Sequence, residues 1–371
     1  MPYRQHISRN YSSRGVLSKN RMVANAYHRL TARNAPTLLS IVIPLFNEQD
    51  TLPFLRGELD RFLERLPYPA EVVIVNDGST DSSLDFLAQW ADEDARVRVL
   101  SLARNYGHQY AATAGLDHAA GDAAVLIDAD LQDPLDVIPA MVAQYEGGYD
   151  VVMGKRAIRQ GETVFKRATA WLFYRLMQRL IYRELEPDVG DFRLISRTCL
   201  NALRQMRETH RFLRGMVCWV GFPQTTVEYV RHARQHGTTK YPLRKMLLLA
   251  WTAAVSFSPA PLRASFALGV LAAMAGLGEG VYAVARTLLG YYTVPGWTSV
   301  IVVTCLIGGA ILISIGVLGE YVGRIFEEVK GRPLYTVAER YNMEPLESGQ
   351  ATHAPAEAAL TSGLHRLASR L

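Results

Sequence analysis

The sequence predicts an α/β fold: a mostly parallel sheet with helices on both faces, followed by an amphipathic segment and a two-helix membrane hairpin. Three observations support this prediction. Apolar, β-branched runs alternate with helical patterns through the first 153 residues, as in sheets whose parallel strands are joined by helices. Each run ends in polar, charged or glycine residues. Two long apolar stretches of bilayer-spanning length then follow in the C-terminal half.

Composition limits the classes of protein to consider. The chain has 371 residues, of which 49% are hydrophobic and 20% charged, enough for one sizeable core and an additional element. The formal net charge of +5 suits a protein that meets phosphate groups or an anionic membrane surface, although it proves neither. Cys199, Cys218 and Cys305 have no metal or disulfide spacing, so we interpret them as reduced.

The predicted sheet contains five strands. Apolar, β-branched runs place them at 38–44, 71–75, 97–100, 123–127 and 149–153. Helical patterns separate the strands at 51–66, 82–91 and 110–118. Before the first strand, residues 1–37 contain seven Lys or Arg residues, no acidic residue and no apolar core. We therefore expect a flexible basic arm there and no signal peptide.

The strand ends carry the candidate functional residues. Open α/β sheets bind ligands beyond the carboxyl ends of their strands. These ends fall at 46–48, 76–81, 104–108, 128–130 and 154–156. Carboxylates stand in the middle of the set and cations at one flank. That arrangement suits a nucleoside diphosphate bridged by a metal ion.

Two aspartates after the fourth strand are the most informative of these residues. Asp128 and Asp130 lie two positions apart, so in an extended chain their carboxylates point the same way. Carboxylate oxygens suit Mg²⁺ or Mn²⁺, and such ions are usually shared with substrate phosphates. An isolated Asp-x-Asp is more often a solvated acidic loop. The four other polar strand ends favour the metal.

The C-terminal half predicts a membrane hairpin within 263–325, with spans at about 264–285 and 299–321. A buried helical hairpin in a soluble core is the alternative, and Glu279 interrupts the first span. By the positive-inside rule, basic flanks place both ends of the hairpin in the cytosol. These flanking residues are Arg244, Lys245, Arg263, Arg324, Lys330 and Arg332. Residues 243–262 are amphipathic and expected in the interface. Residues 326–371 are expected to form a cytosolic C-terminal segment, disordered after about 344.

Seven short motifs occur in a fixed order between 39 and 335. They are Ile-Pro-Leu-Phe-Asn-Glu at 43–48, Val-Asn-Asp-Gly-Ser at 75–79, Arg-Asn-Tyr-Gly at 104–107, Asp-Ala-Asp-Leu-Gln-Asp-Pro at 128–134, Gly-Asp-Phe-Arg-Leu at 190–194, Thr-Lys-Tyr at 239–241 and Gly-Glu-Tyr-Val-Gly-Arg at 319–324. With them the chain resembles glycosyltransferase family 2, which has the GT-A fold. Within that family it is most similar to the bactoprenol glucosyltransferases of the GtrB type. Enzymes that transfer mannose to dolichyl phosphate, or aminoarabinose to undecaprenyl phosphate, share less.

The resemblance implies a cytosolic catalytic domain at 38–242 with a role for each candidate residue. Nucleoside contacts are expected from Pro44, Asn47, Glu48 and Asp77. The metal and diphosphate are expected at Asp128, Asp130 and Gln132, with Asp130 as the direct ligand. A turn cap is the alternative for Asp77, and an acidic loop that caps a helix is the alternative for the metal set.

The remaining roles concern phosphate and the reaction centre. The resemblance implies phosphate clamps at Arg156 and Lys166, the lipid phosphate at Arg234 with Lys240 in support, and a catalytic carboxylate at Asp191. Each has a simpler alternative. The two clamps are more often solvated cations, and Arg234 fits ordinary positive-inside charge. Asp191 fits a structural pair with Arg193. His108 and His118 have no metal spacing and are interpreted as structural.

The implied reaction transfers a hexose, expected to be glucose from UDP-glucose, to polyprenyl (undecaprenyl) phosphate with inversion at the anomeric carbon. The metal-dependent enzyme would be a multi-pass protein of the bacterial inner membrane, with both termini cytosolic. Glycines 316, 319 and 323 permit close helix contact in a homo-oligomer, and relatives suggest a tetramer. No nucleic acid partner is expected.

Four other functions remain for comparison. One is transfer of another sugar (mannose, galactose or an amino sugar) to the same acceptor. The second, a processive polysaccharide synthase, usually has more membrane helices and a Gln-x-x-Arg-Trp motif, which this chain lacks. The third is a non-catalytic, membrane-tethered nucleotide-binding protein, expected to have lost the acidic pair. A dinucleotide oxidoreductase is disfavoured because no Gly-x-Gly-x-x-Gly follows the first strand.

Overall fold

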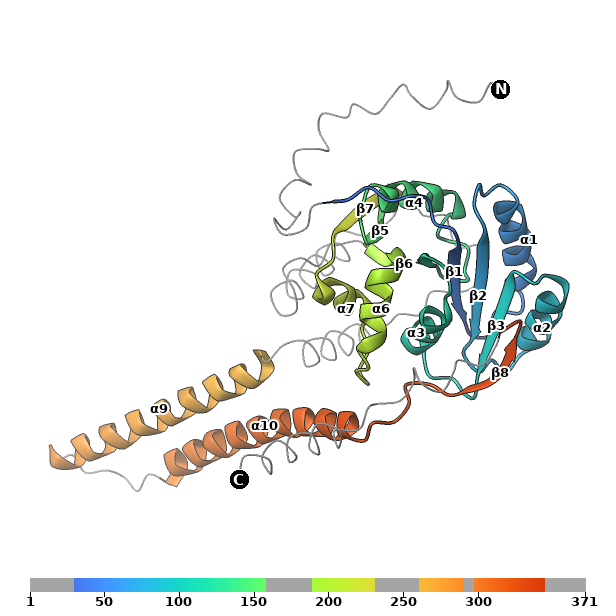
Figure 1. Ribbon diagram of the computed structural model, residues 1–371. Coiled ribbons are helices and arrows are strands. Elements are labelled where there is room, and N and C mark those ends of the chain that lie inside the picture. Colours follow the sequence, from blue (N-terminus) through green and yellow to red (C-terminus); the bar gives the residue numbers. More distant parts are fainter. Residues whose placement is uncertain (1–29, 158–188, 231–259, 290–296, 344–371) are drawn as a thin grey trace, which may run out of the picture.

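A computed structural model describes residues 30–157, 189–230, 260–289 and 297–343, and an eight-stranded mixed sheet is its central element (Figure 1). The strand order is β7-β5-β6-β4-β1-β2-β3-β8. The strands are β1 (Leu39–Leu45), β2 (Ala70–Asn76), β3 (Val97–Leu102), β4 (Ala123–Leu126), β5 (Val151–Arg156), β6 (Val189–Ser196), β7 (Gln224–Tyr229) and β8 (Val337–Tyr341). The helices around the sheet are α1 (Leu52–Leu63), α2 (Ser83–Glu93), α3 (His108–His118), α4 (Ile138–Glu146), α6 (Arg197–Gln205) and α7 (Leu213–Val220).

The five predicted strands are confirmed, with no limit shifted by more than three residues. Strands β1 to β4 pair in parallel, with β1 between β2 and β4. Strand β5 runs in the same direction as β4, because both pair antiparallel with β6 between them. The carboxyl ends of all five strands therefore meet at one edge of the sheet.

Three strands were not predicted, and one of them shapes the site. Strand β6 runs against its neighbours β4 and β5, so its first residues reach the edge where the other strands end. Gly190 and Asp191 are placed there by this reversal. Strand β7 pairs in parallel with β5. Strand β8 is short and largely exposed, and lacks the apolar alternation that marks a strand in the sequence.

Helices cover both faces of the sheet, as predicted. Along β1, Ile41 and Ile43 belong to an apolar layer with α1, α2 and α4, whereas Val42 faces the opposite layer with α3, α6 and α7. Side chains on a strand alternate between faces, so a run buried on both faces reads as continuously apolar. Cys199 and Cys218 are buried and form no disulfide among the described residues, in agreement with the interpretation of these two as reduced.

The apolar stretches form two long helices, α9 (Ala260–Leu288) and α10 (Trp297–Val329). Each contains a segment long and apolar enough to cross a membrane, at Pro261–Arg286 and Val302–Val329. Their apolar side chains are mostly exposed, unlike those of a helix in the core of a soluble protein. The predicted spans lie within these helices. Most of the predicted amphipathic segment, including Trp251, lies outside the described residues.

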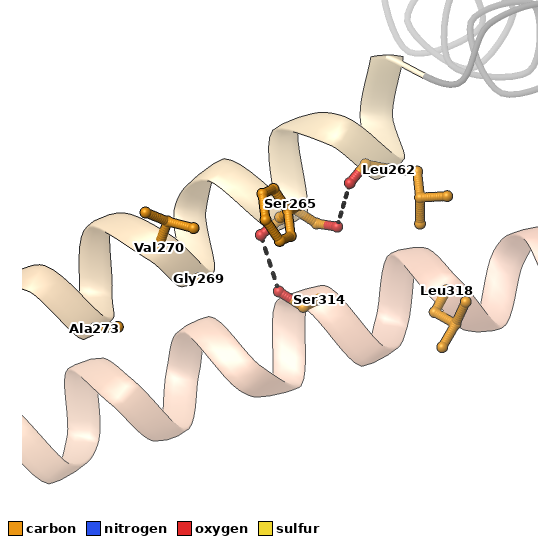
Figure 2. A pocket seen from close by; sticks show the side chains of 8 residues that line it. Leu262, Ser265, Gly269, Val270, Ala273, Ser314 and Leu318 are labelled. Atoms are coloured by element: carbon orange, nitrogen blue, oxygen red, sulfur yellow. Dashed lines mark hydrogen bonds between the residues drawn. The ribbon is translucent and has the colours of Figure 1, made fainter.

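The two long helices pack against each other. The Ser314 hydroxyl of α10 donates to the Ser265 carbonyl oxygen of α9 at 3.3 Å (Figure 2). A groove of about 560 Å³ opens beside this contact. Its lining is almost entirely apolar: Leu262, Ser265, Phe266, Gly269, Val270, Ala273, Ser314 and Leu318. The groove lies in the hairpin, away from the polar strand ends.

After α10 the chain returns to the sheet. Strand β8 pairs antiparallel with β3, and the Ala103 amide donates to the Thr336 carbonyl at 2.9 Å (Figure 1). Beyond β8, the Asn342 side-chain amide donates to the carbonyls of Ala91 and Val97. Residues on both sides of the hairpin therefore build one sheet.

Gly78 is expected to be intolerant of a side chain. Its φ is +65°, and a Cβ there would lie 2.4 Å from the Arg104 carbonyl carbon. Gly78→Ala should therefore destabilise the fold by at least about 2 kcal/mol through backbone strain and the clash. The thermal unfolding midpoint of the purified protein should fall by about 4–8 °C. Gly57→Ala in α1, where no atom lies within 4 Å, should leave the midpoint unchanged or slightly raised. Equal midpoints in the two variants would contradict this expectation.

Candidate active site

The ends of β1 and β2 are joined by side-chain contacts to the backbone. Asn47 adopts a positive φ of 53°, and its side-chain oxygen accepts from the Thr80 amide at 2.8 Å. Glu48 accepts from the Thr51 hydroxyl at 2.7 Å, and Pro44 is buried within β1. The predicted nucleoside residues of β1 therefore stand at the sheet edge, beside the loop that follows β2.

Asp77 is buried directly after β2. Its two carboxylate oxygens accept from the amides of Tyr106 and Gly107, each at 2.8 Å. Burial raises the pKa of Asp77, although these amides and the nearby His108 favour the ionised form. The carboxylate holds the loop between β3 and α3, a structural role that differs from the turn cap considered from the sequence. Its predicted contact with a nucleoside stays a prediction.

The loop after β4 gathers negative charge. Asp128 has 32% of its side chain exposed. Burial raises the pKa of Asp128, and the carboxylates of Asp191, Asp133 and Asp130 raise it further against the opposing effect of His108. Asp130 accepts from the Gln132 amide at 3.2 Å. An added cation would offset this concentration of negative charge.

Backbone strain marks the same loop. Leu131, between Asp130 and Gln132, has a φ of 55°, in the left-handed region. That conformation costs about 1–2 kcal/mol for a residue with a side chain. Strain of this kind persists where the surrounding structure enforces it, and it is concentrated at ligand-binding loops. The loop geometry therefore supports a functional role for 128–132.

The predicted metal set fits an ion shared with the substrate. Within the described parts of the chain, no three His, Cys, Asp or Glu side chains are grouped to hold a metal by themselves. The predicted set is two carboxylates and one amide, Asp128, Asp130 and Gln132, and leaves coordination positions for phosphate oxygens. Hard oxygen donors and the surplus negative charge fit Mg²⁺ or Mn²⁺. The identity of the ion stays a prediction.

Asp191 lies close to two arginine side chains and one histidine side chain. Arg214 donates to both carboxylate oxygens, at 2.9 Å from Nε and 3.1 Å from Nη2. The Arg193 Nη2 lies 3.6 Å from Oδ1, and the His108 Nε2 lies 3.5 Å from Oδ2. Burial pushes the pKa of Asp191 upward, but the hydrogen bond from His108 and the positive charges of Arg214 and Arg193 outweigh burial and hold the pKa well below its ordinary value. Asp191 is therefore ionised at neutral pH.

His108 corrects the sequence interpretation, which treated it as structural. Its Nε2 lies 3.7 Å from Asp128 Oδ1 as well as 3.5 Å from Asp191 Oδ2. Burial disfavours the charged imidazole, but the carboxylates outweigh burial and raise the pKa of His108. Its place within the third polar strand end, 104–108, was the available signal. His118 is buried with Nδ1 2.8 Å from the Ala114 carbonyl, in agreement with a structural role.

Arg214 was also missed, and no sequence signal pointed to it. It lies 23 positions from its partner Asp191, in a segment rich in arginine. The alternative for Asp191 was a structural pair with Arg193. Arg193 is buried and lies near Asp191, but it donates a hydrogen bond at 2.9 Å to the Gly190 carbonyl. The main partner of Asp191 is Arg214.

Arg156 is the only predicted phosphate clamp within the described residues. It ends β5, and a Cβ on Gly190 would lie 3.0 Å from its Nη2. Arg156 therefore lies beside Gly190 at the start of β6, and Gly190 is the residue before Asp191. Lys166, Arg234 and Lys240 lie outside the described residues, so their roles stay predictions.

A mixed α/β sheet with carboxylates at its ligand-binding edge, followed by two apolar helices, fits the class predicted from the sequence, a glycosyltransferase with the GT-A fold. The family model described as "Glycosyl transferase family 2" matches residues 40–204. An uncharacterized glycosyltransferase, YkcC of Bacillus subtilis, is 42% identical over 82% of this chain and 94% of its own length. The chain belongs to glycosyl transferase family 2.

Other relatives cover the same extent. The SfII prophage-derived bactoprenol glucosyl transferase of Shigella flexneri is 39% identical over 83% of this chain and 99% of its own length. A prophage bactoprenol glucosyl transferase homolog of Escherichia coli K12 is 39% identical over 81% and 98%. Among solved structures, mannosyl-3-phosphoglycerate synthase from Rubrobacter xylanophilus has a TM-score of 0.43 and 19% identity, covering 59% of this chain and 73% of that one. The family assignment rests on the sequence relatives.

Proposed function

We propose that this protein transfers glucose from UDP-glucose to polyprenyl phosphate, inverting the anomeric carbon, at the cytosolic face of a bacterial inner membrane. The observation that carries the proposal is the meeting of Asp128, Asp191 and His108 at the ligand-binding edge of the sheet, in a chain with two apolar helices. Similarity to bactoprenol glucosyl transferases over most of the chain supports glucose and a polyprenyl acceptor.

The ligands would divide the sheet edge between them. The nucleoside would lie at the ends of β1 and β2, near Asn47 and Asp77. The diphosphate would lie over Asp128, Asp130 and Gln132, which would hold the ion. Bound there, Mg²⁺ or Mn²⁺ would neutralise the charge of the departing diphosphate. Arg156 and Lys166 would add positive charge for the same phosphates.

The ionised state of Asp191 favours one of its predicted roles. The oxygen of a polyprenyl phosphate is already anionic at neutral pH, so the acceptor needs little help from a base. A fixed carboxylate repels that anion but stabilises the positive charge that develops on the sugar as its bond to the diphosphate breaks. Because Arg214 donates to both of its oxygens, Asp191 enters the reaction already oriented.

The hairpin would keep the acceptor lipid beside the site. An isoprenoid tail stays in the bilayer, whereas its phosphate must reach the sheet edge. The proposed topology is multi-pass with both termini in the cytosol, in agreement with the basic flanks of the two apolar helices. A homo-oligomer, expected to be a tetramer, remains part of the proposal.

A donor screen tests the proposed reaction. Purified protein in vesicles with undecaprenyl phosphate and Mn²⁺ would receive labelled UDP-glucose, UDP-galactose, UDP-N-acetylglucosamine or GDP-mannose. The expected result is labelled lipid from UDP-glucose at the highest rate. A higher rate with another donor would overturn the sugar assignment. UDP binding with no transfer from any donor would support the non-catalytic alternative.

Arg234→Ala is expected to weaken use of the lipid acceptor selectively. If Arg234 contacts the lipid phosphate, its loss removes one charge-assisted hydrogen bond and should raise the KM for polyprenyl phosphate about tenfold. The KM for UDP-glucose should change less than about twofold, because the donor is bound elsewhere. Arg231→Ala in the same basic segment is the matched control. Equal effects of the two substitutions would indicate general membrane attraction instead.

A further inference from the structure

The C-terminal end of α10 contacts the catalytic domain at the segment that leads into α7. The Glu328 carboxylate accepts from the Thr209 amide at 2.9 and 3.0 Å and from the Thr209 hydroxyl at 2.5 Å. Beside it, the Glu327 Oε2 lies 2.7 Å from the His210 Nε2. Two successive acidic residues of the helix thus contact two successive residues of the domain.

The same segment is held from the other side by the first turn of α3. The Tyr110 hydroxyl donates to the Thr209 carbonyl at 2.5 Å. Gln109 accepts from the amide of Leu213, the first residue of α7, at 3.0 Å. His108, the residue before Gln109, lies 3.5 Å from Asp191. Three successive residues of α3 thus connect Thr209, the start of α7 and the Asp191 carboxylate.

Helix α7 completes the connection. Arg214 is its second residue and donates to both oxygens of Asp191. A two-bond arginine–carboxylate pair requires both groups to be aligned, so it transmits small shifts of the helix. Glu328 thus contacts Thr209, and Tyr110 and Gln109 of α3 link Thr209 to the start of α7. Arg214 in α7 then contacts Asp191.

We propose that the end of the membrane helix α10 positions the reactive carboxylate: Glu328 is a positioning residue that sets the start of α7, and through Arg214 the orientation of Asp191. This inference rests on the proposed function, since it gives Asp191 its catalytic role. Misplacing a reacting group by about 1 Å can reduce turnover by about 100-fold. Glu328 is exposed and acts indirectly, so the expected effect is smaller, about tenfold on kcat.

The first test compares three variants of the full chain. Glu328→Ala removes the acceptor, whereas Glu328→Gln keeps an accepting oxygen. Glu93→Ala is the matched control, because Glu93 also joins two elements, through a 2.6 Å contact with Arg56, but these elements are α2 and α1, on the face of the sheet opposite α3 and α7. We expect kcat to fall about tenfold in Glu328→Ala only. The KM for UDP-glucose and the dissociation constant of UDP should not change.

Hydrogen exchange gives a readout that needs no turnover. In Glu328→Ala the amides of 206–216 should exchange faster than in the wild type, whereas those of α1 and α4 should not. The Glu93→Ala variant should leave 206–216 unchanged. Unchanged exchange in Glu328→Ala would overturn the proposal even if the donor screen detected no transfer at all. Conversely, transfer by the wild type with an unchanged kcat in Glu328→Ala would overturn only the positioning role.

A double-mutant comparison separates positioning from general loosening. If Glu328 acts through Arg214, the variant with both Glu328→Ala and Arg214→Ala should have the same kcat as Arg214→Ala alone. If the two substitutions acted independently, their separate reductions of kcat would multiply in the double variant, and that result would contradict the proposed route. Arg214→Ala combined with Glu93→Ala serves as the reference for residues that do not interact.

Discussion

Asp130→Ala is expected to abolish transfer of labelled glucose from UDP-glucose into lipid, reducing turnover by at least about 100-fold. The proposed role of Asp130 is to hold the divalent ion against the diphosphate. Without that ligand the negative charge on the departing group would be left without its main counter-charge. The folded chain should still be recovered in the membrane, since Asp130 is only half-buried on a loop.

The matched control for this substitution is Asp136→Ala. Asp136 lies six positions further along and is exposed, with 78% of its side chain accessible and Arg65 3.4 Å away. Its replacement should leave turnover unchanged. An excess of chelator should reproduce the Asp130→Ala result in the wild type, and added Mn²⁺ should reverse it. Normal turnover in Asp130→Ala, or in chelator, would count decisively against a metal at this loop.

Asp191→Asn is the second substitution with a large expected effect. It keeps the shape of the side chain but removes the negative charge proposed to stabilise the sugar in the transition state. We expect kcat to fall by about 10²–10³-fold with little change in UDP-glucose affinity, because the donor is held by other strand ends. Single-turnover transfer and binding of UDP-glucose, measured separately, check the two parts of this expectation.

Loss of stability is the competing explanation, because Asp191→Asn leaves Arg193 and Arg214 without their counter-charge. Asp117→Asn controls for it. Asp117 is also buried, and it accepts from Arg207 at 2.6 Å and from the Tyr335 hydroxyl at 2.9 Å. Both variants should lose thermal stability, but only Asp191→Asn should lose kcat in the fraction that remains folded. Similar losses of kcat in the two variants would assign Asp191 a structural role.

The sequence predicted those elements whose signal is local. Strands β1 to β5 are recognisable because burial on both faces makes them continuously apolar, and their order with the helices indicated a parallel sheet. Strand β6 was missed, although Asp191 within it was assigned through the resemblance. Only the antiparallel direction of β6 explains how Asp191 meets Asp128, and strand direction is set by long-range pairing.

The contacts of Asp191 illustrate what a single sequence does not contain. His108 follows a polar strand end and was within reach of the same reasoning that selected Asp128. Arg214 was not, because its significance depends on the packing of α7 against the sheet. The contact between Glu328 and Thr209 joins residues 119 positions apart and follows from no motif. The two apolar helices were predictable from their length and composition, but α10 continues to Val329, eight residues beyond the predicted span.

The return of the chain to the sheet after α10 fixes an order of biosynthesis. A ribosome delivers residues 337–341 only after both apolar helices have been made, so β8 is the last of the eight described strands to become available to the sheet. Until β8 arrives, β3 presents unpaired amides and carbonyls, the kind of edge at which chains associate wrongly. A truncated soluble form ending before residue 260 would keep that open edge permanently. With the proposed topology, the sheet is therefore completed only after insertion of the hairpin can begin.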